Sequence, residues 1–129
     1  MEDYNCFGCD PDNPIGLRLQ FQLDGDEVTA RWEPHPNMQG YPAVIHGGIQ
    51  ATLADEIGGW YVMAMLGTAG VTRSLEIQYE QPARAAEGPF LLRARDAGPA
   101  DETAVDGGTG DAGAAAQDNQ IGKRNPFAA

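Results

Sequence analysis

Hydrophobic and polar residues alternate along the first part of the chain as half-buried strands require. Residues 16–23 alternate with a period of two, and residues 27–33 do so again. A turn signal, Asp-Gly-Asp at 24–26, separates them, so the two segments predict a β-hairpin. Residues 34–45 follow with three prolines and a glycine, which excludes a helix there and predicts a long loop.

The pattern changes to a helical period from Gly48 to about Leu66. Apolar residues form one stripe at three- and four-residue spacing, and others lie across from it, so the helix is expected to be buried on most sides. Gly67 marks its end, and two further strands are predicted at 71–83 and 88–96. One long helix packed on an antiparallel sheet is an α+β arrangement.

The apolar pattern disappears after residue 96. Residues 97–129 consist mainly of Ala, Gly and Asp, with Val105, Ile121 and Phe127 as the bulky apolar residues. Such a segment buries too little surface to offset the entropy of ordering it. We therefore expect a folded domain over residues 1–96 and a disordered, low-complexity tail over residues 97–129.

Length and charge restrict the classes of function. The chain has 129 residues, with 19 acidic against 8 basic side chains and a net charge of −11. This charge argues against nucleic acid or an anionic membrane as the main partner, but it leaves room for a small anionic ligand. No apolar run is long enough to span a membrane and no secretory signal is evident, so we expect a cytoplasmic protein.

Cys6 and Cys9 form a C-x-x-C pair in a turn-rich segment. A zinc site normally needs four ligands, and a redox motif normally lies between a strand and a helix. We interpret the pair as a structural turn with free thiols, and a metal shared with another chain or a disulfide remains the alternative. Neither a metal nor a redox cofactor is expected to take part in the chemistry.

The start of the helix, His46-Gly47-Gly48, has the composition of an anion site. Backbone N–H groups in the first turn have no helical partner, and residues without Cβ let a ligand oxygen approach them closely. Gly47 and Gly48 could therefore form an oxyanion hole, although on the glycines alone a glycine N-cap or a tight loop-to-helix turn is the better explanation. His46 suits either a capping role or contact with a leaving group.

Two carboxylates lie inside the buried helix. Asp55 and Glu56 point about 100° apart, so both cannot easily reach water. Burying a carboxylate is costly, and catalytic sites accept this cost because burial adjusts the group for its task. Asp55 is the stronger catalytic candidate, since Glu56 could also lie at the helix edge or pair with an arginine such as Arg73.

The spacing along the helix has a further implication. Gly48 and Asp55 are seven residues apart, which places them on the order of 10 Å apart along the axis. One carbonyl carbon cannot contact both. An amide and an acid acting on the same carbonyl would come from two copies of the chain, which predicts a homodimer, or a dimer of dimers, with the site at the interface.

Residues 38–60, MQGYPAVIHGGIQATLADEIGGW, resemble the hotdog-fold acyl-CoA thioesterases of the PaaI-like group. The segments CFGCDPDNPIGLRL and VTRSLEIQYEQPA are also similar to this family and occur in the right order, so the resemblance covers about residues 4–96. It implies a long central helix wrapped by an antiparallel sheet, and hydrolysis of an acyl-CoA thioester. It also implies two strands after residue 96. The tail is not expected to form them, which indicates a C-terminal segment altered by truncation, frameshift or genuine variation.

The resemblance also implies roles for individual residues. Gly47 would supply the N–H that polarises the thioester carbonyl, and Asp55 of the partner subunit would be the nucleophile or general base. His46 would lie near the leaving thiol, and Thr72 would position the attacking water. The residues expected to bind substrate are Gly48, Gln39 and Glu56.

Two other functions remain open. The chain could be a degenerate hotdog module that binds acyl-CoA without turnover, which the loss of the last strands would favour. It could also be another hotdog enzyme that acts on acyl thioesters, such as a dehydratase. The order His-Gly-Gly…Asp fits hydrolysis better.

Overall fold

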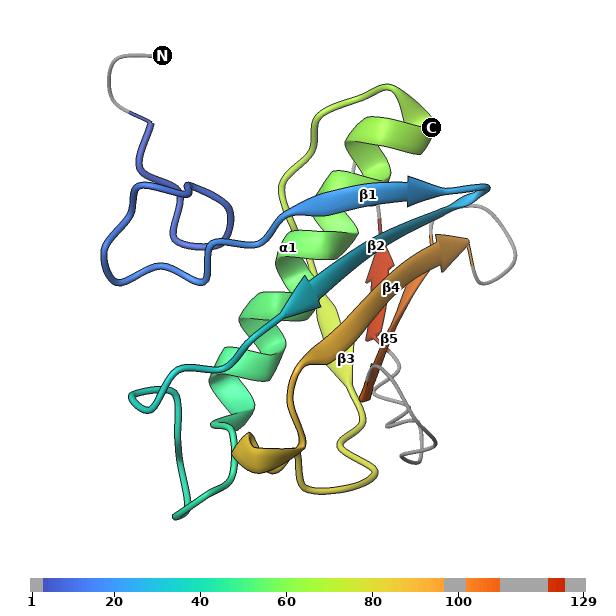
Figure 1. The fold of residues 1–129 in the computed structure, drawn as a ribbon. Helices are drawn as coiled ribbons and strands as arrows, with labels where there is room; N and C mark the ends of the chain where they lie inside the picture. Colours follow the sequence, from blue (N-terminus) through green and yellow to red (C-terminus); the bar gives the residue numbers. More distant parts are fainter. Residues whose placement is uncertain (1–3, 97–101, 110–120, 125–129) are drawn as a thin grey trace.

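The structure, a computed structural model, describes residues 4–96, 102–109 and 121–124. In this part of the chain one long helix, α1 (Gly47–Leu66), lies against a six-stranded antiparallel sheet (Figure 1). The strand order is β1-β2-β4-β5-β6-β3. The strands are β1 (Phe21–Asp24), β2 (Glu27–Trp32), β3 (Leu75–Ile77), β4 (Phe90–Asp96), β5 (Glu102–Thr109) and β6 (Ile121–Arg124), and a short 3-10 helix, η1 (Ala85–Glu87), precedes β4.

The predicted hairpin forms from β1 and β2, with Asp24 opposite Glu27 across the turn. Gly25 lies between them with φ 63°, in the left-handed region that glycine adopts at little cost. β1 begins at Phe21, later than the alternation indicated, because the preceding residues pair with the N-terminal loop. Leu17 and Leu19 are buried, and their N–H groups donate to the carbonyls of Phe7 and Gly8 at 2.7 and 2.9 Å.

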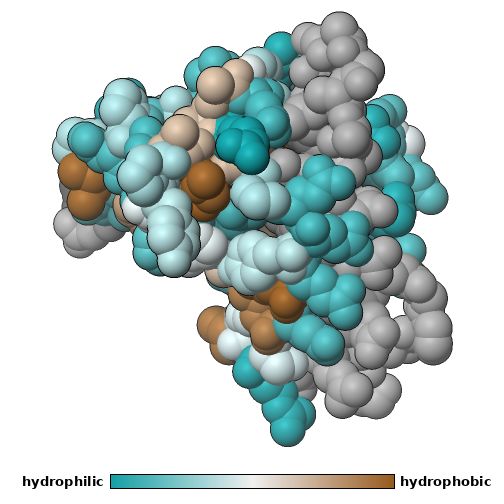
Figure 2. Space-filling model, turned by 90° about the horizontal axis from the view of Figure 1, so that it is seen from below, coloured by the Kyte–Doolittle hydropathy of each residue, from teal (hydrophilic) through white to brown (hydrophobic). Residues whose placement is uncertain are grey.

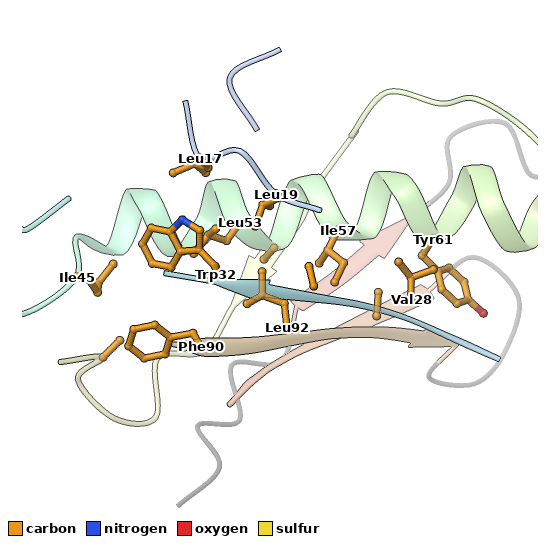
Figure 3. Packing of buried hydrophobic residues seen from close by; sticks show 14 of the residues in the cluster. Leu17, Leu19, Val28, Trp32, Ile45, Leu53, Ile57, Tyr61, Phe90 and Leu92 are labelled. Atoms are coloured by element: carbon orange, nitrogen blue, oxygen red, sulfur yellow. The ribbon is translucent and has the colours of Figure 1, made fainter. Parts of the chain in front are cut away.

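The helix has nearly the predicted bounds. It begins one residue earlier than expected, at Gly47, with His46 as its N-cap, and it ends at Leu66 before Gly67, which has φ 65°. Glycine is the usual residue after a helix because a Cβ is disfavoured in that conformation. Two α1 side chains, Leu53 and Ile57, point into the core between helix and sheet (Figure 3).

That core is built from the inner faces of α1, β2 and β4. Ile57 and Ala94 are completely buried, and Val28 is almost so. Burying a side chain of the size of Ile57 contributes about 1.5 to 3 kcal/mol to stability. Trp32 and Phe90 are opposite each other in the β2–β4 register, with ring centroids 6.1 Å apart. The contacts of α1 with β2 and β4 fix the position of the helix on the sheet.

Strands also form beyond residue 96, which corrects the expectation that the last strands are missing. β5 pairs with β4 from Phe90↔Thr109 to Asp96↔Thr103, and β6 joins β5 to β3. Ladder hydrogen bonds come from backbone groups, so a segment poor in large apolar residues can pair with the open edges of β4 and β3. Residues 97–101, 110–120 and 125–129 of the predicted tail lie outside the described residues, and the domain boundary at residue 96 stays a prediction.

β3 is shorter than the predicted strand 71–83. The residues before it form the exposed loop that leaves α1, and the residues after it lie against the long loop that precedes the helix. There Ile45 donates its N–H to the carbonyl of Ala83 at 2.7 Å. In the part of the chain that the structure covers, no helix combines the length and the apolar character needed to cross a membrane.

Candidate active site

The N-terminus of α1 is closed by a side-chain cap. Nδ1 of His46 accepts a hydrogen bond from the N–H of Gly48 at 2.9 Å. An imidazole nitrogen that accepts carries no proton, so a neutral His46 has its proton on Nε2. The exposed ring therefore offers a donor at the mouth of the helix. Of the two glycine amides expected to bind an oxyanion, that of Gly48 is already used.

Gly47 is the first residue of the helix, so its own N–H has no acceptor within the helix. Its carbonyl accepts a hydrogen bond from the hydroxyl of Tyr79 at 2.7 Å. A Cβ on Gly47 would lie 3.5 Å from the Tyr79 ring, in ordinary contact. The sequence reasoning missed Tyr79. Its place in the segment that resembles the family was a signal, but its partner is a backbone carbonyl, which no residue pattern reveals.

The loop before α1 is held in place by backbone and side-chain hydrogen bonds. His46 donates its N–H to the carbonyl of Met38 at 2.9 Å, and Gly40 donates to Val44 at 3.0 Å. Oε1 of Gln39, a predicted substrate-binding residue, accepts from the N–H of Ala43 at 3.0 Å. Ala43 has φ 66°, so this hydrogen bond supports a turn that an alanine rarely adopts. In the structure Gln39 thus stabilises its own loop.

A pocket of about 620 Å³ opens beside this cap, and we call it the N-terminal pocket. It lies between the loop at residues 40–47, the first turns of α1 and the segment 79–82. Its walls include Tyr41, which is 82% exposed, and Tyr79. Seen from below, the described surface is mostly hydrophilic with small hydrophobic spots (Figure 2). The pocket is large enough for part of a small-molecule ligand.

The predicted acid lies farther along the helix, in a second pocket. The hydroxyl of Thr72 donates a short hydrogen bond to Oδ1 of Asp55. Asp55 is half-buried and Thr72 is exposed on the loop that leaves α1. A donor fixed on one carboxylate oxygen restricts rotation of the side chain. Two residues predicted to act together are thus in direct contact.

The pocket around Asp55, here called the Asp55 pocket, has a volume of about 390 Å³. It is formed by the middle of α1, including Glu56 and Trp60, and by the loop at residues 69–72. Among the described residues it shares no lining residue with the N-terminal pocket. The segment after α1 contributes to both pockets, with residues 69–72 in the Asp55 pocket and residues 79–82 in the N-terminal pocket. Within one protomer, Gly47 and Asp55 therefore face different cavities.

Glu56 contacts the N-terminal loop as well as the Asp55 pocket. Its Oε1 accepts from the Cys6 thiol, with 3.4 Å between sulfur and oxygen. Cys6 and Cys9 are free thiols whose sulfur atoms lie 3.0 Å apart. Burial, and then the hydrogen bond with Cys6, raises the pKa of the Cys9 thiol to about 12. Cys9 therefore keeps its proton at neutral pH and is a poor nucleophile.

Comparisons with known proteins assign this fold and part of the sequence. A sequence model of the thioesterase superfamily matches residues 43–95, which contain His46, all of α1 and Thr72. No curated protein matches the chain significantly.

Several solved structures share the fold. A thioesterase superfamily protein is 22% identical with a TM-score of 0.75; the match covers 93% of this chain and 62% of that protein, so the chain spans less than two thirds of its length. Zebrafish thioesterase superfamily member 2 is 20% identical with a TM-score of 0.68, over 89% and 88% of the two chains. A phenylacetic acid degradation-related protein from Ralstonia eutropha is 18% identical with a TM-score of 0.64, over 83% of each chain. Residues 43–95 thus match the thioesterase superfamily, and the architecture as a whole is that of the hotdog-fold thioesterase structures.

Proposed function

We propose that the protein hydrolyses the thioester of an acyl-CoA or a related acyl thiol. The observation that carries this proposal is the hydrogen bond between Thr72 and Asp55 at the wall of a pocket on the central helix. It holds an acid on a half-buried helix in one orientation, as a nucleophile or general base requires. The match of residues 43–95 to the thioesterase superfamily supports an acyl thioester as the substrate.

The complete site would be formed by two chains. In one protomer the amide of Gly47 and the carboxylate of Asp55 line different pockets, so neither pocket contains both groups. A two-fold axis can bring the N-terminal pocket of one chain against the Asp55 pocket of another. The active form would then be a homodimer or a dimer of dimers.

The proposed reaction uses each group once. The N–H of Gly47 stabilises negative charge on the thioester oxygen while Asp55 attacks the carbonyl carbon or removes a proton from an attacking water. The carbon–sulfur bond breaks, and the departing thiolate accepts a hydrogen bond from Nε2–H of His46 and takes its proton from solvent. If Asp55 attacks directly, water then cleaves the resulting anhydride and restores the carboxylate.

A binding module without turnover is the second candidate. The expected loss of the last strands was its main support, and β5 and β6 occupy the corresponding places in the sheet. Both candidates predict acyl-CoA binding, and only the enzyme predicts release of free thiol. A panel of acyl-CoA esters of different chain length and polarity, assayed for thiol release and for binding, separates the two.

The decisive variant is Asp55→Asn, which keeps the shape of the side chain and an oxygen that can still accept from Thr72. Turnover should fall by about 100-fold or more, with acyl-CoA binding nearly unchanged, because only the charge and basicity of the group are lost. Glu56→Gln is the matched neighbour and should reduce turnover less. If the two variants rank the other way, the acid is Glu56, and if Asp55→Asn stays within a few-fold of the parent, Asp55 is not catalytic.

A further inference from the structure

Three potential metal ligands converge where the N-terminal loop meets the helix. The sulfur atoms of Cys6 and Cys9 and a carboxylate oxygen of Glu56 all lie within 4.8 Å of one another, and each residue is half-buried. The two thiols belong to one tight turn of the loop, and the carboxylate comes from the middle of α1. The proposed hydrolysis uses neither thiol.

The separations are close to those of a tetrahedral site. With metal–sulfur bonds of about 2.3 Å and metal–oxygen bonds of about 2.1 Å, a sulfur and an oxygen ligand lie about 3.6 Å apart and two sulfurs about 3.8 Å apart. The Cys6–Glu56 distance is 3.4 Å and the Cys6–Cys9 distance is 3.0 Å. A small rotation of the Cys9 side chain would therefore suffice to admit an ion.

Two polar groups lie beside the thiols. The N–H of Cys9 donates to Sγ of Cys6 at 3.3 Å, and the hydroxyl of Tyr4 lies 2.5 Å from Sγ of Cys9. Donors of this kind orient metal ligands and stabilise their charge. The turn itself is closed by the N–H of Asp10, which donates to the carbonyl of Cys6 at 3.2 Å. The turn thus presents both sulfurs on the side that faces α1.

Gly8 allows the third ligand to reach this turn. A Cβ on Gly8 would collide with the Glu56 side chain, so only a glycine leaves room for the carboxylate between turn and helix. Once the two thiols lose their protons on binding, the thiolates and the carboxylate would repel one another without the cation. A divalent ion reverses that repulsion, whereas a disulfide would leave the carboxylate without a role.

We propose that Cys6, Cys9 and Glu56 bind one divalent cation of the zinc type, with water in the fourth position. On binding, the two thiols release their protons to solvent and form two metal–sulfur bonds, and the Glu56 carboxylate completes the protein ligands. The ion fastens the N-terminal loop, which contributes Leu17 and Leu19 to the core, onto the helix next to Asp55.

The test uses the full chain, produced in zinc-supplemented medium without a histidine tag. We expect about one zinc ion per chain by elemental analysis after gel filtration. Replacement by Co²⁺ should produce a thiolate-to-cobalt charge-transfer band in the near ultraviolet and the visible bands of tetrahedral cobalt. A folded parent that retains no zinc and shows neither band would overturn the proposal, as would a mass that reveals a Cys6–Cys9 disulfide in freshly purified protein.

Variants identify the ligands. Cys6→Ser and Cys9→Ser should abolish the charge-transfer band or halve it, and Gly8→Ala, which displaces Glu56, should weaken cobalt binding by at least about tenfold. Glu87→Gln, at an exposed acid at the end of η1, is the matched control and should bind cobalt like the parent. Zinc should raise the melting temperature of the parent and leave that of the Cys6→Ser/Cys9→Ser double variant unchanged. An unaltered cobalt spectrum in that double variant overturns the assignment, even if its stability differs.

Discussion

Thr72 and Asp55 are 17 residues apart in the sequence and form one hydrogen-bonded pair in the structure. Asp55 belongs to the helix α1, whereas Thr72 lies on an exposed loop. The position of the Asp55 carboxylate is therefore set by the helix, and the Thr72 hydroxyl donates to it. Holding a reacting group in one orientation can account for a large part of the rate enhancement of an enzyme. This contact makes Thr72 a positioning residue in the proposed reaction, because it acts through Asp55.

Thr72→Val should therefore lower kcat by about 10- to 100-fold with little change in KM, since the Asp55 carboxylate loses the donor that orients it. Thr72→Ser keeps the hydroxyl and should restore most of the rate. Thr68→Val is a matched control in the same loop, because the Thr68 hydroxyl contacts the carbonyl of Ala69. Steady-state kinetics on the preferred acyl-CoA give the answer, and a Val variant within twofold of the parent contradicts the role.

At the scale of elements, β5 and β6 connect β4 to β3 within one sheet. β5 lies against the full length of β4, and β6 lies against β3. Without them both β4 and β3 would expose unpaired backbone donors and acceptors, and the sheet would cover less of α1. The low apolar content of this region therefore does not make it dispensable.

A chain that ends after Asp96 should lose stability for this reason. We expect its melting temperature to fall by at least about 5 °C, the change that about 1 kcal/mol causes in a domain of this size. A chain that ends after Arg124 keeps both strands and is the control. Circular dichroism melts of the two proteins provide the comparison. Equal melting temperatures would support the original expectation of a disordered tail.

At the scale of the whole molecule, the sequence predicted the elements that carry a strong apolar pattern. The period of residues 48–66 and the glycine at 67 predicted α1 nearly to the residue, and the alternation around residues 24–26 predicted the hairpin. β5 and β6 were not predicted, because strands that pair through their backbones need no apolar pattern in the sequence. The roles of Thr72 and Asp55 were only implied by family resemblance, and their contact within one chain was not predicted. The cluster of Cys6, Cys9 and Glu56 depends on a loop path that no local pattern specifies.

Mixing two inactive variants tests whether the active site is formed by two chains. In Asp55→Asn the amide of Gly47 is intact, and in Gly47→Val the acid is intact. Random exchange should give mixed dimers with one complete site each, and so about a quarter of the parent activity. Mixing Asp55→Asn with Thr72→Val, two changes in the same half of the site, should give no such gain over the separate proteins. No recovery despite exchange shown by native mass spectrometry would argue for a site within one chain.

The two indole rings of this molecule lie in different surroundings. Trp32 is almost fully buried, and its Nε1 has no hydrogen-bond partner in the described part of the chain, whereas Trp60 is half-buried, stacks on Phe21 at 4.9 Å and lines the Asp55 pocket. Indole emission shifts to shorter wavelength where no mobile water can relax around the excited ring. Trp32 is thus a constant, blue-shifted background, and Trp60 is a built-in optical probe whose emission changes when a molecule enters the pocket. The protein can report its own occupancy without a label.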